Sequence, residues 1–109
     1  MNINANISAM DALGSAYQVT ANNVANVNTD GFQASRANLE SGPEGDGVRV
    51  SSITTDTTPG AMFEGRETSN VDTASEMVGM ITTENAYAAN AAVIHAGDQT
   101  TGYLLDMLV

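Results

Sequence analysis

The sequence predicts a mainly α-helical fold, in which two long terminal helices form an antiparallel, coiled-coil-like pair with a small β-hairpin or loop segment between them. Apolar residues recur at alternating steps of four and three near both ends of the chain, which is the spacing of one helix face, whereas glycine and proline cluster in the middle. The 109 residues include no tryptophan and only 5% aromatic side chains, so a thick globular core is not available and the helices must pack along one another. We expect one structural domain, with an N-terminal helix over residues 1–30, a connector with short β-strands over 31–68 and a C-terminal helix over 69–109.

An apolar stripe marks the N-terminal helix. A helix that only covers its own core would carry charges on its outer face, yet Asp11 is the only charged side chain between Met1 and Thr29. Asparagine, serine, glutamine and threonine occupy the outer face instead, which favours contact with protein on more than one side. The stripe keeps heptad spacing for about three heptads and consists of Ile3, Ile7, Met10, Gly14, Tyr17, Ala21 and Val24.

Four asparagines, Asn22, Asn23, Asn26 and Asn28, stand where this stripe ends. Asparagine costs up to roughly 0.7 kcal/mol relative to alanine within a helix, so the cluster calls for a physical reason. A paired buried amide fixes the register between helices, whereas an unpaired one costs roughly 1–3 kcal/mol. Two explanations stay open on physical grounds: the amides set a register, or they belong to a solvated, frayed helix end. Gly31 is suited to a left-handed C-cap just beyond them.

The connector changes to a strand-like period. The stretch SGPEGDG, over residues 41–47, predicts a turn, and the alternation that follows predicts a short strand from Val48 to Ile53. A second turn at Pro59 and Gly60 precedes another possible strand through Met62 and Phe63. Two such strands form at most a small hairpin, which is marginal by itself.

The C-terminal helix has a clear start signal. Residues 73–76, Thr-Ala-Ser-Glu, fit a capping box, and Asn70 with Asp72 offers an alternative start one turn earlier. A second apolar seam beside the main stripe implies contact with more than one helix, and Gly97 and Gly102 predict a kink or a frayed tail. The main stripe is Met77, Met80, Tyr87, Ala91, Ile94, Leu105 and Leu108, with Glu84, Asp98 and Thr101 as misfits, and the second seam is Val78, Ile81, Ala88 and Ala92.

Charge and composition exclude several classes of function. The formal net charge of −10 argues against nucleic acid or an anionic membrane as a partner. All three basic side chains, Arg36, Arg49 and Arg66, lie in the connector, so no salt bridge can join the two ends of the chain. The chain has no cysteine, no run that predicts a cleavable signal peptide and no stretch that predicts membrane insertion.

No motif predicts catalysis, a cofactor or a small-molecule substrate. The alternation from Asn26 to Gly31 matches the first half of a calcium loop, but Ala37 stands where the bidentate carboxylate is needed. His95 is the only histidine, which disfavours a transition-metal site. We therefore expect no enzyme, no metal and no cofactor.

Two segments carry a family resemblance. TANNVANVNTDGF, over residues 20–32, closely resembles the N-terminal signature of the bacterial flagellar axial proteins, the rod and hook family. SNVDTASEMVGMITTENAYAAN, over residues 69–90, resembles the C-terminal signature of the same family, and GVRVSSI and PGAMFEG stand where that family places its inner strands. The short middle is most similar to the proximal-rod type.

This resemblance implies a structural subunit of the flagellar basal-body rod, which assembles through its terminal helices for flagellum-dependent motility. The implied partners are further copies, other rod and axial proteins and the flagellar export apparatus, and the implied location is the periplasmic rod, reached without a cleavable signal peptide. We expect the assembly interface to consist of Ile3, Ile7, Met10, Tyr17, Asn23, Val24, Asn26, Asn28, Gly31, Phe32, Asn70, Val71, Met77, Met80, Ile81, Tyr87, Asn90, Ile94, Leu105 and Leu108.

Two other hypotheses follow from the residues alone. An acidic helical hairpin could serve as an adaptor or chaperone-like module for a basic partner, and such a module would stay monomeric or dimeric. Calcium-responsive binding would raise the melting temperature with calcium and leave it unchanged with magnesium.

Overall fold

The computed structural model describes residues 3–43 and 46–108, so the predictions that fall on Met1, Asn2, Glu44, Gly45 and Val109 lie outside the described residues. Along the chain, one long helix precedes and another follows two small antiparallel sheets, which are formed by β1 with β2 and by β3 with β4. The elements in chain order are α1 (Ile3–Ala25), β1 (Ser35–Ser41), β2 (Val48–Thr55), β3 (Met62–Phe63), β4 (Arg66–Glu67) and α2 (Thr73–Leu108).

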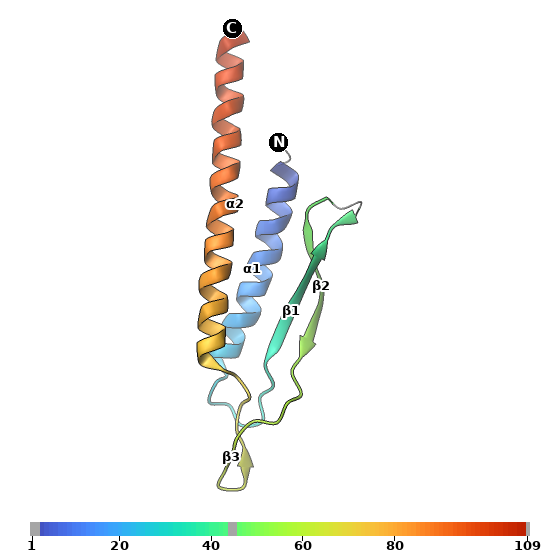
Figure 1. Cartoon of the computed structure of the whole chain (residues 1–109), viewed down its shortest axis with the longest axis vertical. Coiled ribbons are helices and arrows are strands. Elements are labelled where there is room, and N and C mark those ends of the chain that lie inside the picture. The colour runs from blue at the N-terminus through green and yellow to red at the C-terminus, as the bar shows by residue number, and fades with distance from the viewer. Residues whose placement is uncertain (1–2, 44–45, 109) are drawn as a thin grey trace.

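The two helices run antiparallel and side by side, which confirms the predicted architecture (Figure 1). The molecule is a rod of 74 × 26 × 14 Å. Helix α1 lies between α2 on one side and the β1–β2 hairpin on the other, and it packs against both (Figure 1). With 36 residues against 23, α2 extends well past the start of α1.

The face that α2 turns to α1 overlaps the predicted stripe only in part, at Met80, Ala91 and Ile94. Its least exposed residues repeat at steps of three and four, but most of them lie about one position before the predicted stripe. Small residues, such as Gly79 and Thr83, lie on this face. Met77 and Tyr87 of the predicted stripe stay exposed as a result. The observed contact face comprises Glu76, Gly79, Met80, Thr83, Ala86, Asn90, Ala91, Ile94 and Gly97.

The predicted break near the end of α2 does not occur. The helix continues through Gly97 and Gly102 to Leu108. Gly97 is buried within the helix. A single glycine costs about 1 kcal/mol in a helix interior, too little to interrupt a helix of 36 residues.

Asp72 caps α2, which begins at Thr73, so the predicted capping box does not form. Of the alternative pair, Asn70 and Asp72, only Asp72 caps the helix, because the Asn70 side chain bonds elsewhere. The Asp72 Oδ1 atom accepts hydrogen bonds from the N–H groups of Ala74 (3.1 Å) and Ser75 (3.5 Å). The side chain of Glu76, which would complete a capping box, accepts a hydrogen bond from Asn23 instead. A carboxylate at the N-cap satisfies the orphan amides of the first turn and complements the helix dipole.

Helix α1 ends at Ala25, earlier than the sequence suggested. Its last turn tightens, because Val27 N–H donates to Val24 O at 3.2 Å. Gly31 has the left-handed backbone expected of it, with φ 72°, but it does not cap the helix. Its N–H donates to Glu67 O at 2.9 Å, which ties the end of the α1 turn to β4.

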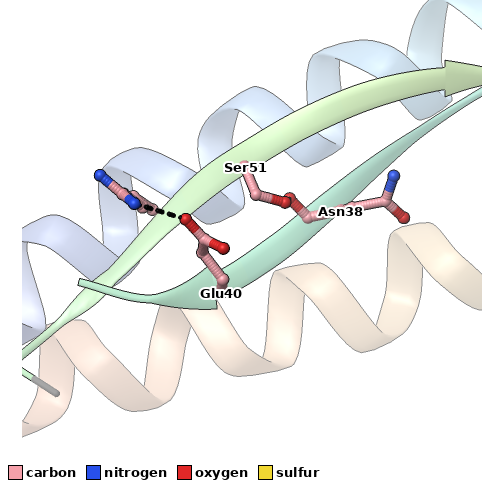
Figure 2. A network of polar contacts seen from close by, with 4 residues as sticks. Asn38, Glu40 and Ser51 are labelled. Carbon is pink, nitrogen blue, oxygen red and sulfur yellow. Dashed lines mark hydrogen bonds and ion pairs between the residues drawn. The ribbon is translucent and has the colours of Figure 1, made fainter. Parts of the chain in front are cut away.

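Strand β2 covers the predicted strand, but its partner was not expected. It pairs with β1, across the predicted turn at residues 41–47, and not with Met62 and Phe63. The register shifts after Asn38, because Ser51 is an extra residue in β2. Figure 2 shows Ser51 and Asn38 close together at this bulge, where Ser51 Oγ donates to Asn38 O at 3.1 Å.

Strand β3 pairs with β4 in a hairpin of its own. Both residues of its turn, Glu64 and Gly65, have positive φ, at 50° and 79°. Positive φ at both central positions is the geometry of a type I′ turn, which suits the twist of two short strands.

The part of the chain that the structure describes buries very little. Only Ala12, Asn23 and Gly97 fall in the buried class there. No helix among residues 3–43 and 46–108 is both long and apolar enough to cross a membrane.

Candidate assembly interface

Asn23 joins three elements at the base of the molecule. Its amide nitrogen donates to Ser35 O at 2.7 Å and to Glu76 Oε1 at 3.2 Å, and its amide oxygen accepts from Ser35 N–H at 2.9 Å. The side chain is only 1% exposed. The end of α1, the start of β1 and the first turn of α2 therefore meet on one amide.

Asn70 makes a second joint beside the first. Its amide oxygen accepts from Ala34 N–H at 2.7 Å, and its amide nitrogen donates to the carbonyls of Asp56 and Thr58, both at 2.8 Å. It therefore ties both ends of the β1–β2 hairpin to the start of α2. Thr58 N–H also donates to the Asp56 carboxylate at 2.9 Å, and this bond lowers the pKa of Asp56.

Tyr17 and Glu84 connect the helices midway. The Tyr17 hydroxyl donates to Glu84 Oε1 at 3.1 Å. This hydrogen bond raises the pKa of Tyr17, because it holds the proton and places a carboxylate beside the phenol. Glu84, which is a misfit in the predicted apolar stripe, accepts the hydrogen bond from Tyr17. Around the pair runs an open, largely apolar groove between the helices, lined by Leu13, Gly14, Tyr17, Gln18, Thr83, Glu84, Tyr87 and Ala88.

The tip of the β1–β2 hairpin is held on α1 by Ser8. Its hydroxyl accepts from Val48 N–H at 3.1 Å and donates to Ala5 O at 2.8 Å. Gly47 is required here, since its φ is 79° and a Cβ atom would collide with the Ser8 hydroxyl. Sequence reasoning missed Ser8, because an isolated serine on a helix gives no signal for such a contact.

Large apolar side chains are exposed along α2. Tyr103, Leu104 and Leu105 are more than half exposed, and Met107 and Leu108 reach 81% and 83%. The face of α2 that contacts α1 ends near Gly97, and every residue from 98 to 108 is exposed. We call residues 98–108 the overhang of α2. A contiguous apolar surface of this kind normally marks an interaction site.

The expected interface residues divide by exposure. Asn23 is the one that is buried. Those with partial cover are Ile3, Met10, Tyr17, Val24, Asn26, Phe32, Asn70, Val71, Met80, Asn90 and Ile94. Those that are exposed are Ile7, Asn28, Gly31, Met77, Ile81, Tyr87, Leu105 and Leu108. Large apolar residues that are exposed but were not part of the expected interface are Leu39, Ile53, Met62, Phe63, Val78, Val93, Tyr103, Leu104 and Met107.

Asn26 completes the turn after α1. Its amide nitrogen donates to Asn22 O at 2.9 Å, and its amide oxygen accepts from the Thr29 hydroxyl at 3.0 Å. Asp30, farther along the same turn, pairs with Arg66 at 3.4 Å. The side-chain oxygens of Asn26 and Asp30, two of the three in the pattern that resembled half of a calcium loop, therefore already have protein partners.

Both helices are acidic and carry no arginine or lysine. Within the described residues, the ion pairs are Arg49 with Glu40 and Arg66 with Asp30, and neither joins α1 to α2. Figure 2 shows the first of them on the hairpin, where Glu40 meets the guanidinium group. The helical acids are Asp11, Glu76, Glu84, Asp98 and Asp106.

Comparison with known families assigns both ends of the chain. The family model described as flagella basal body rod protein matches residues 3–33, which span α1 and the turn after it. The model described as flagellar basal body rod FlgEFG protein C-terminal matches residues 64–107, which span β4 and nearly all of α2. The chain belongs to the flagellar basal-body rod protein family. These families consist of structural proteins of the flagellar basal body.

The two matches fit the geometry of this rod protein. They fall on the two helices that pack together, and Asn23 and Asn70, the two joints, lie one in each matched segment. The β1–β2 hairpin lies between the matches. A comparison with curated proteins gives no match.

Proposed function

We propose that this chain is a structural subunit of the flagellar basal-body rod, which assembles through its terminal helices and supports flagellum-dependent motility. The observation that carries the proposal is the uncovered apolar surface of α2, where Met77, Ile81 and the overhang stay exposed although α1 already packs on the helix. Further copies and other rod proteins are the partners that would cover it. Contacts between unlike surfaces extend without closing, which suits a rod.

The asparagines divide between two tasks in this proposal. Asn23 acts inside the subunit, since its amide is already fully used by Ser35 and Glu76. It holds the hairpin at a fixed angle to the helices and so positions the outer surface for neighbours. Asn26 and Asn28 lie in the more exposed turn that follows α1, where a neighbouring subunit can reach them.

We further propose that the chain reaches the periplasmic rod through the flagellar export apparatus. The small number of buried residues supports export through a narrow channel. Ordering the backbone costs about 1–2 kcal/mol per residue, and a chain that buries so little regains only part of this cost before it assembles. A weakly ordered chain passes through a narrow channel more readily than a compact domain does.

A cell that carries only a variant chain tests the proposal. We expect Ile81→Ser to abolish swimming in soft agar while leaving helix content unchanged, because Ile81 is exposed in the free chain and covered only in the assembly. Thr82→Ser, a neighbouring exposed position, serves as the matched control and should swim normally. Electron microscopy of purified basal bodies should place a labelled chain in the rod.

Unchanged swimming with Ile81→Ser, or absence of the label from basal bodies, would contradict the proposal. A chain found in the cell only as a soluble monomer or dimer bound to one basic partner would point to an adaptor instead.

A further inference from the structure

The overhang of α2 combines an apolar surface with acidic charge. It presents Tyr103, Leu104 and Leu105 to solvent, and Asp98 and Asp106 lie on the same stretch of helix. No arginine or lysine lies anywhere on α2. Whatever covers the overhang must supply apolar contact and must also tolerate these carboxylates.

A second copy of this chain is poorly suited to that place. The helical parts of a copy bring Asp11, Glu76 and Glu84 and no basic side chain, so its helices would set acid beside acid. The arginines of a copy offer little relief. Arg49 and Arg66 already pair with Glu40 and Asp30. Arg36 lies near Asp56 and helps to lower the pKa of that carboxyl.

We propose that the overhang of α2 binds an amphipathic helix of a different protein, one that carries an apolar seam flanked by lysine or arginine. This inference rests on the proposed function and names the partner chemistry of one of its surfaces. The overhang continues the helix that already packs on α1, so an incoming helix can lie along α2 beyond Gly97. Flanking basic side chains on that helix would reach Asp98 and Asp106 and select it over another acidic copy.

Two synthetic peptides of about three heptads test this selection. Both have leucine at the two seam positions of each heptad, and the flanking positions carry lysine in one peptide and glutamate in the other. We expect the labelled lysine peptide to bind the full chain at least about tenfold more tightly than the glutamate peptide, as measured by fluorescence anisotropy. Raising the salt from about 0.05 M to about 0.5 M should reduce this difference, since charges are then screened within a few ångström.

Matched variants show whether the overhang is the site. Leu105→Ser should weaken lysine-peptide binding by about tenfold, whereas Ile53→Ser should leave it within about twofold; Leu105 is 57% exposed on α2 and Ile53 58% on β2. Asp106→Asn should weaken binding more than Glu64→Gln, although each change removes one negative charge. Circular dichroism confirms that each variant keeps its helix content.

Equal binding of the two peptides, or equal effects of Leu105→Ser and Ile53→Ser, would overturn the inference. So would self-association of the unmodified chain, through Leu105, as tight as its binding to the lysine peptide. Each of these results leaves the rod assignment intact, because that assignment is tested separately by motility and by location in basal bodies.

Discussion

At the scale of single residues, two neutral side chains of α1 link the helices through hydrogen bonds, where other helical pairs use salt bridges. Tyr17 and Asn23 both donate from α1 to carboxylates on α2, Glu84 and Glu76. Neither helix carries an arginine or a lysine that could serve instead. These two bonds fix where one helix stands along the other.

The buried amide of Asn23 makes the first prediction. Asn23→Leu leaves the N–H and C=O groups of Ser35 without their partner, and an unsatisfied buried polar group costs about 1–3 kcal/mol. We expect the free energy of unfolding to fall by about that amount in urea denaturation. Asn28→Leu is the control, because Asn28 is exposed and its change should matter little. An equal loss of stability in both variants would refute the assignment.

The second prediction concerns the hydrogen bond between Tyr17 and Glu84. The folded state raises the pKa of Tyr17 above 10.0, so the stability that the bond supplies is fully present below pH 10 and is lost as the pH rises through the folded-state pKa. Glu84→Gln should therefore lower the pKa of Tyr17, as followed by NMR titration of the tyrosine ring carbons. The idea fails if Tyr17 titrates at the same pH in both proteins.

A sequence can flag such residues but not their partners. The four clustered asparagines stood out, and their pattern suggested a register-setting role. Asn23, however, bonds to residues 12 and 53 positions away, and no local pattern encodes that distance. Glu84 was read as a misfit for the same reason.

At the scale of elements, the β1–β2 hairpin is held on α1 at its tip and its base. The tip contact depends on Gly47, which leaves room for the hydroxyl of Ser8. The base depends on the two asparagine joints. A hairpin of two strands is marginal by itself, so these attachments decide whether it forms.

Two glycines with the same φ angle allow the cost of backbone strain to be measured separately from the cost of a side-chain collision. Gly47 and Gly65 both have φ 79°, and alanine in this region costs about 1 kcal/mol at either position. A Cβ atom at Gly47 would also collide with Ser8. At Gly65, an added Cβ atom would have no other atom within 4 Å. We expect Gly47→Ala to lose about 1 kcal/mol more than Gly65→Ala in urea denaturation.

Amide exchange gives an independent reading of the same contact. Val48 N–H, which bonds to Ser8, should lose its protection in Gly47→Ala and keep it in Gly65→Ala. Equal protection in the two variants would show that Ser8 does not hold the tip.

The sequence predicted the helices better than the strands, for a physical reason. Helical periodicity is local, so α1 and α2 could be read from their own residues. Strand β1 has few β-branched or aromatic residues, and its formation depends on β2, which lies across a turn. The contact face of α2 was predicted only in part, because several apolar seams share the helix and its own residues do not say which of them meets α1.

At the scale of the whole molecule, the described chain is a thin rod with a stable base and an unsupported end. Asn23, Asn70 and the cap of α2 lie together at the base. Beyond Gly97 no part of the described chain covers α2. Stability should therefore fall from the base toward the end of α2.

Removal of residues 99–109 tests this gradient. Those of its side chains that the structure describes are exposed, so we expect the free energy of unfolding to change by no more than about 0.5 kcal/mol. Swimming should be lost, because the assembly surface is gone. The same chain truncated after Thr82 serves as the contrast and should unfold, since it lacks most of the face that packs on α1.

The unequal lengths of the two helices also set a distance. Helix α2 has 36 residues and α1 has 23, and at 1.5 Å per residue the difference corresponds to a step of about 20 Å. A neighbour seated on that step is displaced along the long axis by an amount fixed in the covalent chain. Inserting seven residues would lengthen the step by about 10 Å and nearly restore the same angular position, so the helix behaves as a ruler for the spacing of whatever stacks upon it.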